Sequence, residues 1–223
     1  MDDTAVIILI IGGVAVFVAV IIMFVAYAER KRREGLEEIA NELGLTFLRD
    51  GDSNIHNQIG GFGLFNQGRR REMSNLIKGT TDEVQIAIFD YKYVTGSGKN
   101  QSTHSQTVAS LQSNLINAPD FTLRPEGMFD KIGGALGFQD IDFETHPQFS
   151  SMFVLKGDNE ARIREFFTNE LLEFFETQSG ISLEARQGAL IFYRPRSRAK
   201  PEQVKDLLSQ AYGVFGAIVD SKG

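Results

Sequence analysis

The run AVIILIIGGVAVFVAVIIMFVAYA, from Ala5 to Ala28, decides the architecture of this chain. It contains 24 residues without a charged side chain. A helix of that length extends about 36 Å, which is enough to cross a hydrocarbon core of about 30 Å. We therefore predict that residues 1–28 form an N-terminal tail and a single transmembrane helix.

A cleaved signal peptide is the alternative interpretation of this run. Ala26-Tyr27-Ala28 resembles the small-x-small pattern of a cleavage site. However, the start of the chain carries Asp2 and Asp3 with no basic residue, and the apolar run is longer than the core of an ordinary signal peptide. A retained signal-anchor fits the sequence better.

The charges that flank the run predict its orientation. Four basic residues follow it and none precedes it: Arg30, Lys31, Arg32 and Arg33. Because basic flanks stay in the cytoplasm, we expect the N-terminus outside and the main domain in the cytoplasm. The same membrane flank can rest on anionic head groups, so the lipid bilayer is the first expected partner.

Small side chains form a stripe along one side of the predicted span. The stripe consists of Gly12, Ala15, Ala19 and Ala26. Small residues let two transmembrane helices approach closely, although no GxxxG is present. Homodimerisation through this stripe is a hypothesis that follows from the pattern.

Composition excludes several classes of function. The part after the anchor loses Asp2 and Asp3 and keeps every lysine and arginine, so its net charge is −4. An acidic domain is not expected to bind nucleic acid. The chain has no cysteine, which excludes disulfides, thiol catalysis and zinc–thiolate sites.

The rest of the chain divides into a stalk and one domain. Residues 29–45 predict a basic flank and a stalk helix, with Gly35 as a point where the helix bends. We predict that residues 46–223 form the cytoplasmic domain, and we expect a short strand at 45–48, where the stalk meets it. Residues 50–82 fit no period and are expected to form loops with one or two short strands. Their three consecutive arginines, residues 69–71, predict a solvated turn, or alternatively a second membrane-facing patch.

A hairpin is the clearest element of the domain. VQIAIFDYKYV, residues 84–94, alternates, so Ile86 and Ile88 share one face while Phe89, Tyr91 and Tyr93 share the other. Residues 96–100 turn the chain, and residues 101–111 return as a polar strand. Further strands are expected at 121–123, 151–155, 181–185 and 189–194. Helices are expected at 128–137, after Asp158 with a break at Thr168-Asn169, and after Pro201. This grouping predicts an α+β domain around a mainly antiparallel sheet.

The glycine-rich turn at 96–100 is not a P-loop. That motif requires glycine at position 93 and serine or threonine at position 100, where this chain has Tyr93 and Asn100. The hairpin instead offers a candidate binding surface made of Tyr91, Tyr93, Lys99 and His104. No serine or histidine motif of a catalytic site is recognisable, and no cofactor is expected.

An acidic segment offers weak candidates for metal binding. If residues 140–146 are extended, one face carries Asp140, Asp142, Glu144 and His146. Oxygen and nitrogen ligands of this kind suit a hard or borderline cation. Neighbours on one face of a straight strand stand about 6.6 Å apart, which is too far for one ion without a bend. A solvated edge strand is the simpler interpretation.

Two stretches resemble a family of bacterial single-pass membrane-anchored proteins that contain a domain of unknown function. These are FDYKYVTGSGKNQSTHSQTV, residues 89–108, and DIDFETHPQFS, residues 140–150. The resemblance covers most of the chain and implies a bacterial plasma (inner) membrane. It implies no activity, cofactor or site residue.

Two functions remain open at this point. The favoured expectation is a non-enzymatic binding or scaffolding domain that is tethered to the cytoplasmic face and holds an unidentified protein partner. The alternative is a metal-dependent, hydrolase-like enzyme that uses the segment from Asp140 to His146.

Overall fold

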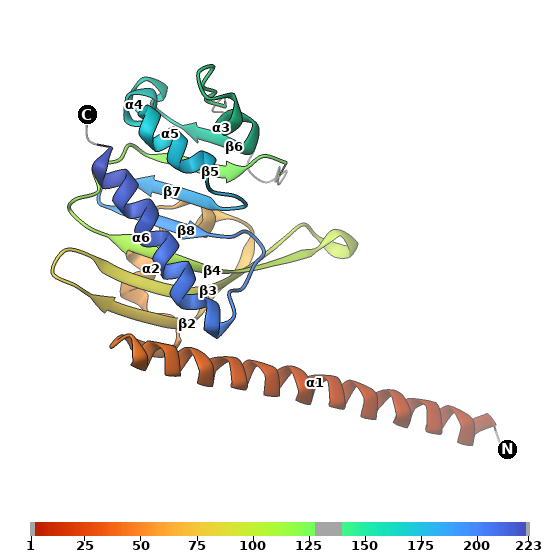
Figure 1. Ribbon diagram of the computed structural model, residues 1–223. Helices are drawn as coiled ribbons and strands as arrows, with labels where there is room; N and C mark the ends of the chain where they lie inside the picture. The colour runs from red at the N-terminus through yellow and green to blue at the C-terminus, as the bar shows by residue number, and fades with distance from the viewer. Residues whose placement is uncertain (1–2, 128–139, 222–223) are drawn as a thin grey trace.

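A computed structural model describes residues 3–127 and 140–221, and it has one long helix followed by an α+β domain (Figure 1). The predicted fold class is confirmed. One eight-stranded antiparallel sheet has the order β1-β2-β3-β4-β8-β7-β5-β6. The strands are β1 (Thr46–Asp50), β2 (Arg69–Thr80), β3 (Gln85–Thr95), β4 (Ser102–Gln112), β5 (Phe121–Pro125), β6 (Phe153–Gly157), β7 (Ser182–Arg186) and β8 (Ala189–Tyr193). The helix expected at 128–137 lies outside the described residues.

Helices cover both faces of the sheet. The α-helices after the long α1 (Asp3–Glu42) are α2 (Ser53–Ile59), α3 (Pro147–Met152), α4 (Glu160–Phe166), α5 (Asn169–Glu176) and α6 (Val204–Asp220). The described residues also contain three 3₁₀ turns, η1 (Gly63–Asn66), η2 (Gly98–Asn100) and η4 (Pro201–Gln203). In Figure 1, α6 crosses the front of the sheet and α2 lies behind it.

The apolar run and the stalk form one unbroken helix. The 40 residues of α1 extend about 60 Å, and the expected bend at Gly35 is absent. Gly35 instead allows a close approach, because a Cβ at this position would lie 3.0 Å from the ring of Pro201. The next residue, Leu36, and Ala40 one turn after it are buried in the core of the domain. The stalk is therefore part of the folded domain at its C-terminal end.

The N-terminal half of α1 is exposed and apolar. Among the described residues, α1 is the one helix that is long and apolar enough to cross a membrane. Large apolar side chains from Ile10 to Tyr27 are solvent-exposed. An apolar surface of this size on a soluble chain would aggregate, so it requires lipid or another apolar partner.

The two faces of the sheet build two separate cores. Ile86 and Ile88 of β3 face the core that α1, α6 and the α3–α5 region cover, whereas Phe89 and Tyr91 face the core under α2 and η1. This division confirms the predicted alternation. Because β3 is covered on both faces, most of its side chains are buried.

Residues 50–82 are more ordered than the sequence predicts. They contain α2, η1 and the 12-residue strand β2. The register of β2 against β3 shifts between Arg69 and Glu72 and again between Ser74 and Ile77. Arg70 and Asn75 have positive φ at these irregularities. Each bulge resets the alternation of side chains, and the period-two signal of β2 is lost as a result.

Aromatic rings fill the core under α3 and α5. Thr168 separates α4 from α5, as predicted, and its Oγ1 accepts a hydrogen bond from the Leu171 amide. The cap of α4 is Asn159 rather than the expected Asp158. Phe149 is fully buried and its ring lies 5.6–6.4 Å from those of Phe153, Phe167 and Phe175.

Replacing Phe149 tests this aromatic core. We expect Phe149→Ala to lower the free energy of unfolding by about 3–5 kcal/mol, because it removes a ring and leaves a cavity. Phe174→Ala, at a half-buried ring nearby, serves as the control and should cost less than about 2 kcal/mol. Urea denaturation of the detergent-solubilised chain, followed by circular dichroism, measures both. Equal losses would contradict this description of the core.

Candidate functional site

A buried carboxylate joins α1 to the sheet. Asp90 of β3 lies on the face toward α1, and its side chain is 5% exposed. Arg32 of α1 binds it in a bidentate manner, with Nε 3.0 Å from Oδ2 and Nη2 2.8 Å from Oδ1. The same guanidinium donates to the Ala199 carbonyl at 2.7 Å. Paired, planar contacts of this kind fix orientation as well as distance.

A second arginine extends the cluster. Arg198, in the segment between β8 and α6, donates to Asp90 Oδ2 at 3.0 Å and holds both oxygens of Glu29 at 2.6 and 3.0 Å. Asn75 of β2 and Thr107 of β4 also donate to Asp90, at 2.9 and 2.8 Å. The two arginines and two acids balance in charge. We call Glu29, Arg32, Asp90 and Arg198 the junction cluster.

The charges in the cluster stabilise one another. Desolvation raises the pKa of Asp90, but the hydrogen bonds and charges of Arg32, Asn75 and Arg198 outweigh it and hold that pKa below the usual value. The hydrogen bond from Arg198 likewise lowers the pKa of Glu29. Both carboxylates are therefore ionised at neutral pH.

The structure divides the predicted membrane flank into different roles. Arg32 is mostly buried and binds Asp90, so it belongs to the junction cluster. Arg30 is exposed and pairs with Glu34 one turn along the helix. Lys31 is exposed and Arg33 is half-buried. Only part of the flank is thus oriented away from the domain.

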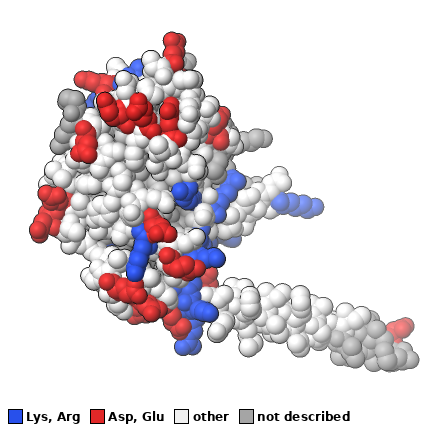
Figure 2. All heavy atoms as spheres, viewed as in Figure 1, with Lys and Arg blue, Asp and Glu red and all other residues white. Residues whose placement is uncertain are grey.

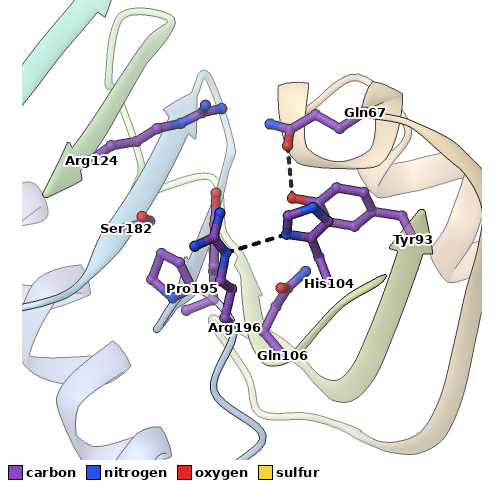
Figure 3. A pocket seen from close by; sticks show the side chains of 9 residues that line it. Gln67, Tyr93, His104, Gln106, Arg124, Ser182, Pro195 and Arg196 are labelled. Carbon is purple, nitrogen blue, oxygen red and sulfur yellow. Dashed lines mark hydrogen bonds between the residues drawn. The ribbon is translucent and has the colours of Figure 1, made fainter. Parts of the chain in front are cut away.

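A small polar cavity lies at the base of the β3–β4 hairpin (Figure 3). Tyr93 and His104 stack with centroids 4.8 Å apart, and the Tyr93 hydroxyl donates to Gln67 Oε1 at 2.9 Å. Arg196 Nε lies 3.4 Å from His104 Nδ1, and Thr95 Oγ1 lies 2.8 Å from Nε2. The cavity measures about 20 Å³, which is room for one water molecule.

A buried glutamate borders the same region and fixes the η1 turn. Glu184 of β7 accepts hydrogen bonds from the amides of Gly63 and Leu64, at 2.5 and 3.0 Å. Arg124 lies 3.6 Å away. Burial raises the pKa of Glu184, against the opposing effect of Arg124 and the two amides. Its contacts identify Glu184 as a structural acceptor for η1.

The predicted binding surface on the hairpin is largely internal. Tyr91, Tyr93 and His104 are each at most 4% exposed, and burial raises the pKa of Tyr91 to about 12. The structure does bring Tyr93 and His104 together, but as a packed stack. Of the four residues, Lys99 alone is exposed, at the tip of the hairpin. These rings cannot contact a partner in this conformation.

A larger groove, which the sequence did not reveal, lies between α2 and the sheet. It has a volume of about 350 Å³, within the range of ligand and side-chain sites. Polar groups line most of it: Thr46, Asp52, Asn54, Gln58, Lys78, Thr80, Gln85, Ser110 and Gln112. Asp52 and Lys78 form an ion pair, and Gln112 donates to Gln58 at 3.2 Å. Side-chain amides that both donate and accept suit a polar partner.

The acidic segment 140–146 does not form a strand. Ile141 is buried, and Asp142 and Glu144 are exposed, as the alternation predicted. Asp140 Oδ1 accepts from the Leu155 amide at 2.9 Å, and burial raises the Asp140 pKa. His146 Nδ1 lies 3.0 Å from Thr145 Oγ1. Within residues 3–127 and 140–221, no three acidic, histidine or cysteine side chains gather as metal ligands.

Comparison with known proteins shows the fold alone. No protein-family model and no curated protein matches the sequence. The crystal structure of the mycobacterial trehalose monomycolate transport factor A is similar, with a TM-score of 0.59 and 12% sequence identity. The similarity covers 86% of this chain and 92% of that chain. At this identity it supports the α+β architecture without assigning an activity.

Replacing Asp90 tests the junction cluster. We expect Asp90→Asn to destabilise the domain by about 3 kcal/mol, because it leaves two arginines facing a neutral side chain. Glu72→Gln, which breaks the exposed pair with Lys92, should cost less than about 1 kcal/mol. Because the folded pKa of Asp90 is lowered, its contribution is complete above the unfolded pKa of about 3.9 and disappears as the pH falls through the folded value. Denaturation across pH 2–7 should therefore show that the free energy of unfolding falls less at acid pH in Asp90→Asn than in the native chain. Identical pH profiles would contradict this assignment.

Proposed function

We propose that this protein is a non-enzymatic, single-pass membrane-anchored binding module, with its main domain in the cytoplasm of a bacterial cell. The continuity of α1 carries the proposal. The helix leaves the apolar run and enters the domain core without a break, and the junction cluster binds it to three strands and to the segment before α6. A rigid connection of this kind holds the domain at one height and in one orientation relative to the bilayer.

A domain that is held in one orientation is suited to binding partners at the membrane surface. A flexible linker would allow an enzyme to search for diffusing substrates, whereas a fixed domain presents one face repeatedly to partners in or near the membrane. The fold neighbour is described as a transport factor, which agrees with a role other than catalysis.

The groove beside α2 is the proposed contact site for a protein partner. It borders strand ends that lie away from the hairpin tip, since Gln85 begins β3 and Gln112 ends β4. It therefore opens on the side of the domain remote from the membrane. The side-chain amides of Gln58, Gln85 and Gln112 in its wall can donate to and accept from a polar group of a partner.

The orientation is testable because the chain has no native cysteine. Thr4→Cys and Ser209→Cys place single thiols at the N-terminus and on α6. In intact spheroplasts, a membrane-impermeant maleimide should label Thr4→Cys at once, and Ser209→Cys only after permeabilisation. The reverse pattern would overturn the proposed topology. Release of the chain by alkaline carbonate would overturn the anchoring itself.

The groove is testable by photo-crosslinking in native membranes. A photoreactive residue at Gln85 should capture a discrete partner, while the same residue at exposed Gln148, on α3, should not. Replacing Gln58 with alanine should reduce the yield at position 85 several-fold, since that residue lines the groove. Replacing Gln187, an exposed glutamine in the β7–β8 turn, should leave it unchanged. Equal capture at positions 85 and 148 would contradict the assignment.

A further inference from the structure

The β3–β4 hairpin projects toward the same side as the apolar half of α1. Figure 1 shows its tip extending beyond the sheet in the direction in which α1 leaves the domain. Asp90 of β3 is fixed to Arg32 of α1, so the two elements share a common reference level. From Asp90 to Thr95 the strand advances about 17 Å, equal to about 11 residues of helix. Because the hairpin and α1 diverge in Figure 1, the tip lies to one side of the helix, beside the apolar run.

Basic residues gather around this end of the sheet. Lys99 is exposed in the tip, and Arg69 pairs opposite Val94, where β3 approaches the tip. The Arg69 guanidinium donates to the Gly96 carbonyl and to Gln101 Oε1. Arg70 follows with φ 51° in a bulge and is exposed. Bulges redirect side chains out of the ladder.

The opposite end of the same strands differs in charge. The turn between β2 and β3 carries Asp82 and Glu83, both exposed. Figure 2 shows lysine and arginine side chains (blue) on the projecting hairpin, and acidic side chains (red) over the end of the domain farthest from α1's span. Both colours occur where α1 leaves the domain, in keeping with the ion pairs of Glu29 and Glu34. A chain of net charge −6 thus presents positive charge on the hairpin that projects toward the side on which α1 leaves the domain.

The tip is suited to head groups rather than to hydrocarbon. Residues 95–101, TGSGKNQ, contain no large apolar side chain that would insert between lipid tails. Gly96 has φ +70°, and a Cβ there would collide with the Asn100 carbonyl, so the turn holds one compact shape. A rigid polar loop with one lysine can contact phosphate oxygens without leaving backbone groups unsatisfied in the bilayer core.

We infer that the hairpin tip and the adjacent arginines bind anionic phospholipid head groups of the membrane that holds α1. The inference rests on the proposed anchoring. The bilayer is a plane that α1 crosses, so a second contact at a distance from the helix sets the tilt of the domain. The lipid surface then acts with the junction cluster: one fixes the domain to the helix, and the other fixes the helix and domain to the plane.

Spin labels on the full-length chain test this contact. Ser97→Cys places a label on the tip beside the native Lys99, and Gln187→Cys places a matched label on the far turn. The chain is reconstituted into vesicles of phosphatidylethanolamine and phosphatidylglycerol that contain a nickel-chelating lipid. We expect relaxation by the head-group nickel to be stronger at position 97 than at position 187, because paramagnetic relaxation falls steeply with the distance between the label and the nickel.

Charge variants identify what the tip recognises. In the Ser97→Cys chain, Lys99→Gln with Arg70→Gln should reduce the nickel effect to the level at position 187. Arg162→Gln with Lys205→Gln, the same charge change on α4 and α6, should leave it unchanged. Vesicles in which phosphatidylcholine replaces both phospholipids, with the same nickel-chelating lipid, should give the same reduction as the tip variant. A nickel effect that survives both changes would overturn recognition of anionic lipid.

Two further outcomes separate this inference from the proposed function. A chain that floats with the vesicles but gives equal values at positions 97 and 187 overturns the head-group contact and leaves the anchoring intact. A chain that does not float with vesicles overturns both. Flotation is therefore measured on every sample before the labels are compared.

Discussion

The carboxylate of Asp90 is the constraint on which the arrangement of this protein depends. A buried charge is tolerated only when it is paired and hydrogen-bonded. Two arginines, one amide and one hydroxyl satisfy Asp90, and they come from α1, β2, β4 and the segment before α6. Moving any of these elements would leave charge unpaired in the interior. The cluster adds little net stability relative to an apolar contact of the same size, but it permits very few alternative arrangements.

Fixing α1 in this way gives the two ends of the sheet different surroundings. Strand β3 runs from the acidic turn that contains Asp82 and Glu83 to the hairpin tip that contains Lys99, and the tip lies on the side on which the apolar half of α1 leaves the domain. The groove beside α2 belongs to the remote end. In the proposed arrangement, one domain contacts lipid at one end and a protein partner at the other, with no motion required between them.

Local patterns accounted for the elements whose side chains alternate or recur without interruption. Ile86 and Ile88 against Phe89 and Tyr91 identified β3 because both faces of that strand are covered, each by its own core. The same logic failed for β2, because two irregularities at Arg70 and Asn75 reset the alternation. The same patterns placed Tyr91 and His104 on a surface, although both side chains are buried. An aromatic side chain that carries a polar atom occurs in both settings, so the local sequence does not show whether another element packs over it.

By itself, the sequence determined the apolar span, its basic exit and the α+β class, because each depends on a contiguous run or a short period. Only the tertiary structure decided which contacts the residues of those segments make. Arg32 belongs to a basic flank in the sequence and to a buried ion pair in the fold, because its partner Asp90 is 58 residues away along the chain. Arg198 lies 108 residues beyond Asp90. Contacts at such separations leave no local pattern, and they are the contacts that join the long apolar helix to its domain.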